Sequence, residues 1–70
     1  AFQSPVRGEE IMTLCGLKPG PTIGKIKEDI EEAILSGKIP NEYEAAKEYF
    51  MGIKDAYLKE AKEWELADRN

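Results

Sequence analysis

Two clusters of proline and glycine divide the chain into three segments. The first cluster is Leu-Lys-Pro-Gly-Pro at residues 17–21, and the second is Ser-Gly-Lys-Ile-Pro at residues 36–40. Proline lacks the N–H that a helix interior uses and glycine weakens a helix, so a helix should stop at each cluster. In the later segments, apolar residues recur at helical spacings of three and four. The sequence therefore predicts an all-α fold: a small three-helix domain with a long C-terminal helix.

The first two predicted helices are short. The first covers residues 9–15, with two acids in its first turn, where the helix dipole favours them, and Gly16 as a left-handed stop. The second covers residues 22–36, with Thr22 as its N-cap and a glycine at its end. Four isoleucines spaced three, four and four apart form its apolar stripe: Ile23, Ile26, Ile30 and Ile34.

The third predicted helix covers residues 42–66. Asn41 followed by Glu44 has the character of a capping box at its start. A helix of about 25 residues is about 37 Å long, whereas the second helix spans only about 20 Å. The far end of the third helix must therefore fray, fold against the first helix, or be covered by another surface. Its stripe consists of Tyr43, Ala46, Phe50, Ile53, Tyr57, Ala61 and Trp64.

The composition excludes several classes of function. The chain has 70 residues, of which 41% are hydrophobic and 34% charged, as expected of one small, folded, soluble domain. It contains no histidine and one cysteine, Cys15, so the usual zinc sites and the Ser-His-Asp and Cys-His mechanisms cannot be assembled. We predict no catalytic residue, no metal ligand and no cofactor in this chain, and we interpret Cys15 as a small buried hydrophobe.

The cellular location is predicted from the same composition. No apolar run approaches the roughly 20 residues that span a bilayer, and the Ala-Phe-Gln-Ser-Pro start lacks the layout of a signal peptide. A single cysteine cannot form an internal disulfide, which agrees with a reducing compartment. We expect a cytoplasmic protein with no membrane partner.

Residues 16–25 are the most suggestive of a binding site. A glycine-bearing turn between two helices lets backbone N–H groups approach a phosphate, as in helix-hairpin-helix nucleic-acid modules. The net charge is −4, yet no acid lies between Glu10 and Glu28. Two lysines in the early turns of the second helix oppose its dipole, and such departures cluster at functional positions. The predicted phosphate-binding set is Lys18, Gly20, Thr22, Gly24, Lys25 and Lys27. The alternative is a simple connector, in which Gly24 allows close helix packing.

Two aromatic residues near the end of the chain are interpreted as docking residues. Trp64 lies where this small domain has little left to pack against it, so we predict that Trp64, with Tyr57, anchors another protein surface. The acids at residues 28–32 do not converge on a helix, and we interpret them as a solvated face.

Several short motifs follow one another in a particular order between Ser4 and Phe50. Gly8 precedes the short first helix, Gly-Leu-Lys-Pro-Gly-Pro-Thr-Ile-Gly follows at residues 16–24, and Ala-Ile-Leu-Ser-Gly and Ile-Pro-Asn-Glu come later. This ordered set resembles the C-terminal region of bacterial CCA-adding tRNA nucleotidyltransferases and related poly(A) polymerases.

The resemblance implies that residues 1–70 are a single C-terminal tail domain of a nucleotidyltransferase that adds CCA or A to RNA 3′ ends. That parent would use Mg²⁺ with ATP, and also CTP for CCA addition. Its catalytic head and HD-type domain are absent from this chain, which by itself is then not an enzyme. In the family the tail holds the tRNA body, so the implied partner is tRNA or another RNA 3′ end, contacted through the set of lysines and glycines named above.

The alternative function is a structural module of the same parent without direct RNA contact. Its helices would dock on other domains of the polypeptide or form a homodimer, with Tyr57 and Trp64 as anchors. A freestanding helix-hairpin-helix DNA binder is disfavoured by the acidic balance of the chain.

Overall fold

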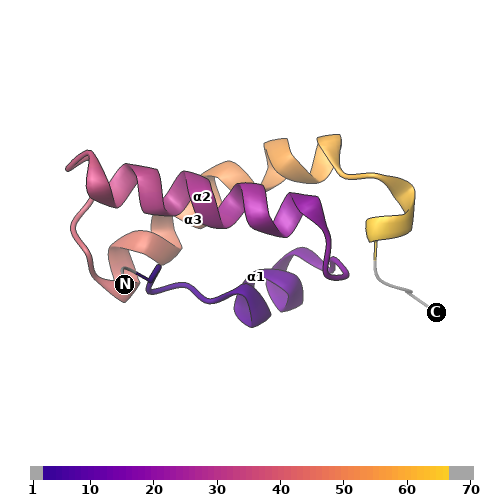
Figure 1. Cartoon of the computed structure of the whole chain (residues 1–70), viewed down its shortest axis with the longest axis horizontal. Coiled ribbons are helices and arrows are strands. Elements are labelled where there is room, and N and C mark those ends of the chain that lie inside the picture. Colours follow the sequence, from indigo (N-terminus) through magenta and orange to yellow (C-terminus); the bar gives the residue numbers. More distant parts are fainter. Residues whose placement is uncertain (1–2, 67–70) are drawn as a thin grey trace.

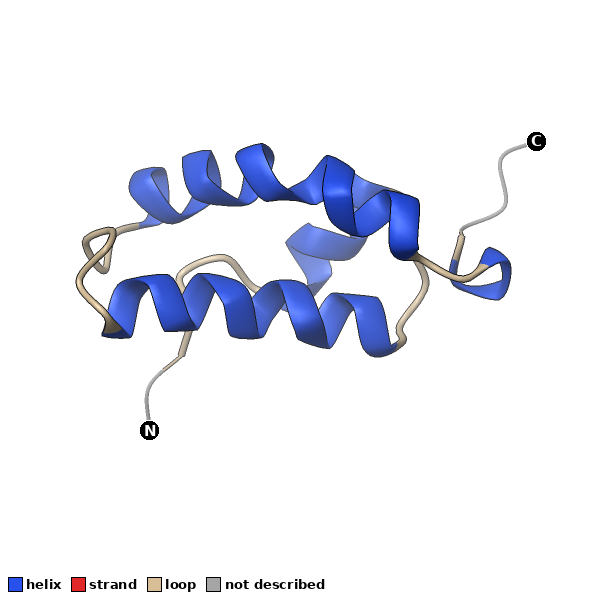
Figure 2. Ribbon diagram, turned by 90° about the horizontal axis from the view of Figure 1, so that it is seen from above, coloured by secondary structure: helices blue, strands red, loops and turns tan. Residues whose placement is uncertain are grey.

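The computed structural model describes residues 3–66. It contains three α-helices followed by one short 3-10 helix: α1 (Gly8–Cys15), α2 (Pro21–Leu35), α3 (Tyr43–Glu60) and η1 (Glu63–Glu65). α2 and α3 run antiparallel as the long elements of the molecule, and α1 lies below α2 in Figure 1. Figure 2, seen from above, shows α2 and α3 as the two long sides. The predicted all-α fold is confirmed, since the only β-pairing among the described residues is an isolated bridge between Leu17 and Leu66.

The hydrophobic core joins all three helices. The isoleucine stripe of α2 is its centre: Ile26 and Ile30 are fully buried, and Ile34 is partly buried against them. Phe50 of α3 and Ile11 of α1 are also fully buried. The predicted stripe therefore faces the core. The remaining members of the core cluster are Val6, Cys15, Leu17, Ile23 and Ala46.

Glycines end the first two helices, as predicted. Gly16 has φ 67°, and its N–H donates to the carbonyl oxygen of Met12. Gly37 has φ 82° and follows the end of α2. Both angles lie in the left-handed region, which favours glycine because a Cβ would clash there.

The starts of α2 and α3 differ from the sequence-based prediction. α2 begins at Pro21, one residue before the predicted cap, because proline is well suited to the first helical position, where its missing N–H would have no partner. Thr22 therefore lies inside the helix and does not cap it. Glu42 precedes α3 without a side-chain cap, so the predicted capping box of Asn41 and Glu44 is wrong.

The predicted third helix over residues 42–66 is also wrong at its far end. α3 stops at Glu60, the backbone of Ala61 and Lys62 is extended, and the chain then turns back through η1. A continued helix would project past the end of α2. The turn instead brings residues 61–66, which we call the C-terminal strap, against the loop between α1 and α2. Tertiary contact thus overrides the local helical preference of these residues.

One carboxylate ties α2 to α3. Asp29 accepts hydrogen bonds from the hydroxyl of Tyr49 at 2.6 Å and from the hydroxyl of Tyr57 at 2.8 Å, one on each carboxylate oxygen. A phenol donates only while it is protonated. The hydrogen bond to Asp29, with a smaller contribution from burial, therefore raises the pKa of Tyr57 to about 12, and the same causes raise the pKa of Tyr49.

This network predicts a loss of stability in alkali. The folded-state pKa of Tyr57 lies above its ordinary value of 10.0, so its contribution is fully present below pH 10 and is lost as pH rises through about 12. Between these limits, the free energy of unfolding in urea should fall more steeply for the natural chain than for Tyr57→Phe. The other titrating groups are common to both proteins, so equal slopes would contradict the role given to this hydroxyl.

Candidate functional site

The C-terminal strap closes over the predicted phosphate-binding turn. The backbone N–H of Lys18 donates to the carbonyl oxygen of Glu65 at 2.6 Å, beside the bridge between Leu17 and Leu66. A Cβ on Gly20 would lie 3.3 Å from both the Trp64 ring and Cγ of Glu65. The backbone of Gly20 is extended, with φ 177°, so glycine provides space for the strap here and relieves no backbone strain.

A buried carboxylate of the strap occupies the start of α2. The hydroxyl of Thr22 donates to both carboxylate oxygens of Glu65, at 2.5 and 3.1 Å, and the N–H of Lys62 donates to one of them at 3.3 Å. Glu65 is 1% exposed and Thr22 is 6% exposed. The helix dipole favours an anion at this end of α2. The anion there is the chain's own side chain.

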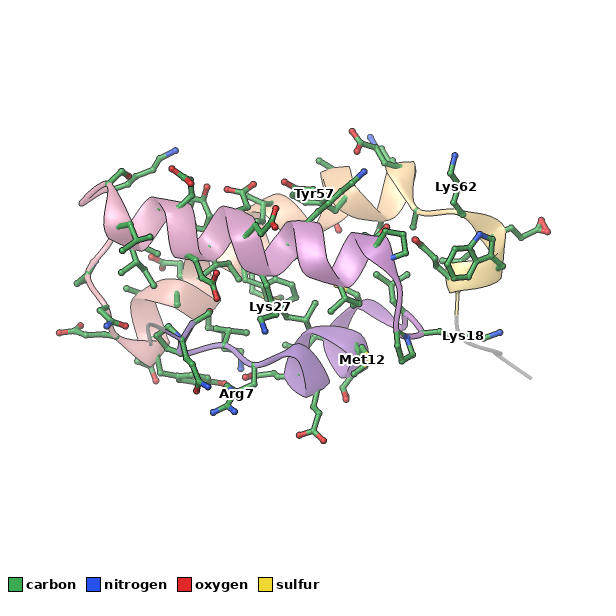
Figure 3. All side chains as sticks on the ribbon, in the orientation of Figure 1. Arg7, Met12, Lys18, Lys27, Tyr57 and Lys62 are labelled. Atoms are coloured by element: carbon green, nitrogen blue, oxygen red, sulfur yellow. The ribbon has the colours of Figure 1, made fainter. Side chains whose placement is uncertain are left out.

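The three predicted lysines do not converge on one point. Lys18 is exposed at the end of the molecule that also carries Lys62 (Figure 3). Lys27 is half-buried on the side of α2 that faces α1, and its Cδ would lie 3.9 Å from a Cβ on Gly8. Lys25 is exposed and points to another part of the surface. It lines a shallow pocket there, together with Glu28, Asp29, Glu32 and Tyr57.

The backbone at Gly24 is open. A Cβ added to Gly24 would meet no atom within 4 Å. The connector interpretation, in which Gly24 allows close packing of two helices, is therefore wrong at this residue. Of the predicted set, Lys18, Gly24 and Lys25 are exposed, whereas the strap covers Thr22 and packs against Gly20.

The two predicted docking residues have different environments. Tyr57 is half-buried, and its hydroxyl is held by Asp29 at the α2–α3 interface. Trp64 remains 59% exposed, although part of its ring lies against Gly20. Leu66, two residues later, is 40% exposed. The exposed apolar surface at this end of the chain is thus that of the strap, and Tyr57 serves mainly to join two helices.

The one cysteine is a packing residue, as predicted. Cys15 is 2% exposed, and burial raises the pKa of its thiol, which disfavours the reactive thiolate. Residues 3–66 contain no group of three or more carboxylate or thiol side chains placed to hold a metal ion. Within the same range, no helix combines the length and apolar character needed to cross a membrane.

Sequence reasoning missed two residues. Glu65 looks like an ordinary charged residue of a helix, and nothing in its neighbourhood signals a partner 43 residues away. Arg7 belongs to a segment that reads as a linker, yet Val6 beside it is fully buried, so the segment is fixed on the core. An apolar residue just before a helix start, as Val6 is in the sequence, is the signal that could have indicated this.

The contact between Thr22 and Glu65 can be tested with a matched pair of substitutions. Thr22→Val keeps the shape of the side chain but removes the hydroxyl that the buried carboxylate accepts from, so it should lower the free energy of unfolding by about 1–3 kcal/mol. Thr13→Val removes an exposed hydroxyl that donates to the Glu9 carbonyl within α1, and should cost less than about 0.5 kcal/mol. Equal effects in urea unfolding would show that the strap contact contributes nothing specific.

Comparisons with known proteins agree with the ordered motifs of the sequence. Residues 5–50 match the family model described as tRNA nucleotidyltransferase domain 2. A CCA-adding enzyme of Streptococcus mutans is 45% identical over 40 residues, covering 57% of this chain and 10% of that protein. CCA-adding enzymes of Streptococcus gordonii and Bacillus cereus are 39% identical over 57 residues and 36% identical over 47 residues, covering 81% and 67% of this chain.

These relatives are much longer proteins. The chain spans 10% to 12% of their length. No solved structure matches it with significance. The family match includes α1, α2 and the turn between them, and it ends at residue 50, before the C-terminal strap. Because the match covers more than half of the chain and the curated relatives agree with it, the chain belongs to the tRNA nucleotidyltransferase domain 2 family, as its resemblance to CCA-adding enzymes predicted.

Proposed function

We propose that this chain is a C-terminal RNA-positioning domain of a tRNA nucleotidyltransferase, which holds the tRNA body while an active site elsewhere in the parent extends the 3′ end. The family match over residues 5–50 is the observation that supports this proposal. The names of the relatives favour CCA as the added sequence. The alternative reaction is the addition of A alone, as by a poly(A) polymerase.

In this proposal the chain binds the tRNA, and other domains of the parent enzyme catalyse nucleotide addition. The parent would be a cytoplasmic enzyme that uses ATP and CTP with Mg²⁺, held by residues outside this chain. The contribution of this domain to the reaction would be entropic, because a held tRNA presents its 3′ end in a fixed position.

The surface at the start of α2 offers a first point of RNA contact. Lys18 and Lys25 are exposed there, and the backbone at Gly24 is open. The net charge of −4 opposes the approach of RNA in most other orientations. Binding should therefore be weak for the domain alone and strongly dependent on salt.

Charge reversal at this surface tests the proposal. Lys18→Glu with Lys25→Glu should weaken tRNA binding by about tenfold at low salt and flatten its dependence on salt concentration, because fewer phosphates are neutralised. Fluorescence anisotropy with labelled tRNA measures both quantities. Lys47→Glu with Lys59→Glu makes the same change in net charge on α3 and is the control. No detectable tRNA binding by the natural chain at low salt would overturn the proposal itself.

The docking alternative has one observation in its favour. Trp64 and Leu66 expose 59% and 40% of their surfaces at one end of the molecule. Aromatic side chains of this kind are common anchors of protein interfaces. Sedimentation across a range of concentrations tests the homodimer form of this alternative: a concentration-dependent dimer that Trp64→Ala abolishes would favour it, and a monomer throughout would remove it.

A further inference from the structure

A small polar pocket lies between the N-terminal segment, residues 3–7, and α2. Its volume is about 130 Å³. The N-terminal segment contributes three of its lining residues and one face of α2 contributes the other two, four positions apart. The full lining is Gln3, Ser4, Arg7, Lys27 and Glu31. In Figure 3, Arg7 and Lys27 lie on the same side of α2.

Four of the five lining side chains can donate hydrogen bonds. Gln3 has an amide, Arg7 a guanidinium and Lys27 an ammonium group. Ser4 is only 3% exposed, and its Oγ accepts the N–H of Val6 at 3.2 Å. The Ser4 hydroxyl, at the wall of the pocket, accepts this hydrogen bond and can also donate one of its own. This cluster contains four hydrogen-bond donors and one carboxylate, that of Glu31, so it suits an anionic ligand that accepts hydrogen bonds.

Neither cation of the pocket forms an ion pair with another residue that the structure describes. The described part of the chain contains one ion pair within 4.0 Å, between Lys54 and Asp55, and neither Arg7 nor Lys27 takes part in it. Glu31 is the single acid in the lining, against two cations. The pocket is therefore locally positive on a molecule whose net charge is negative. Charge unpaired in this manner favours binding of a small anion.

The pocket is also held in shape before any ligand arrives. Val6 is fully buried in the core, which fixes the N-terminal segment against the helices. The stem of Lys27 runs beside Gly8 and is half-buried, which limits the positions of its ammonium group. Lys27 thus loses less conformational freedom on binding than a lysine on a free surface would, and the backbone that carries Arg7 is fixed.

We propose that this pocket binds a single phosphate group of an RNA backbone. The inference rests on the proposed function and moves the main phosphate contact from Lys25 to Lys27 and Arg7. The guanidinium and ammonium groups would form charge-assisted hydrogen bonds to the phosphate oxygens, and the Ser4 hydroxyl could donate a further hydrogen bond. Lys25 is the poorer candidate because its own pocket contains three carboxylates, those of Glu28, Asp29 and Glu32.

The test is a titration of the ¹⁵N-labelled 70-residue chain, followed by NMR, with two probes: tRNA and inorganic phosphate. Arg7→Gln with Lys27→Met should weaken tRNA binding by about tenfold, since two charge-assisted contacts are lost. Methionine retains the stem that packs beside Gly8. The matched control, Lys47→Met with Lys59→Met, removes the same charge from α3 and should change the affinity by less than about twofold. The amide spectra also show whether each variant is folded.

A gain of affinity separates ligand binding from a purely structural role. Glu31→Gln removes the one acid in the lining, so it should tighten tRNA binding by about threefold, and clearly more than Glu48→Gln, which removes the same charge from the exposed surface of α3. Loss of a structural contact would not strengthen binding. In the natural chain, tRNA should shift the amide signals of Ser4, Arg7 and Lys27 more strongly than inorganic phosphate at the same phosphate concentration.

The remaining outcomes distinguish this inference from the proposed function. If the Arg7 and Lys27 variant binds tRNA normally while the Lys18 and Lys25 variant does not, the pocket assignment is overturned and the RNA-positioning function stands. If inorganic phosphate shifts these amides and tRNA does not, the pocket is a site for a free anion and the inference fails. If neither variant changes a measurable tRNA affinity, RNA is held elsewhere on the chain and the inference fails as well.

Discussion

Burial of the isoleucine stripe of α2 is the constraint on which the rest of this structure depends. Ile26 and Ile30 are fully buried, and a domain of 70 residues has few other side chains of that size with which to build a core. The stripe has to be covered from both sides, by α3 and by α1. α2 is therefore the central element, and both carboxylate networks, at Asp29 and at Glu65, involve one of its residues.

Two carboxylates add polar contacts around this apolar core, and both accept hydrogen bonds from protein groups. Asp29 is satisfied by two tyrosine hydroxyls of α3, and Glu65 by the hydroxyl of Thr22 and a backbone N–H of the strap. A carboxylate removed from water is tolerated only when such donors replace its hydration. The contact between Thr22, in the first turn of α2, and Glu65 thus fixes the conformation of the strap. Because the strap follows the region of the family match, it covers a turn that the matched residues alone would leave open.

The sequence predicted the features that local rules determine. The isoleucine spacing indicated the buried face of α2, and Gly16 and Gly37 marked the ends of two helices because only their conformations close those ends without strain. The end of α3 at Glu60 and the burial of Thr22 could not be predicted, because both depend on a contact between residues 22 and 65 that leaves no trace in the spacing of either segment. The polar pocket beside α2 also joins distant residues, and the only hint of it in the sequence is the apolar Val6 next to Arg7 in the N-terminal segment.

The lysines of α2 show why a charge pattern has to be read around a helix as well as along it. Lys25 and Lys27 are two positions apart, which places them about 200° apart around the helix axis. One faces three carboxylates, and the other faces an arginine across a pocket. Under the proposed function, this asymmetry would affect the orientation of the bound RNA more than its affinity. The acidic surface repels an RNA backbone in most orientations, and the few orientations that are not repelled bring a phosphate to the side of Lys27. A net negative charge is therefore compatible with RNA positioning, because repulsion elsewhere on the surface narrows the ways in which the RNA can bind.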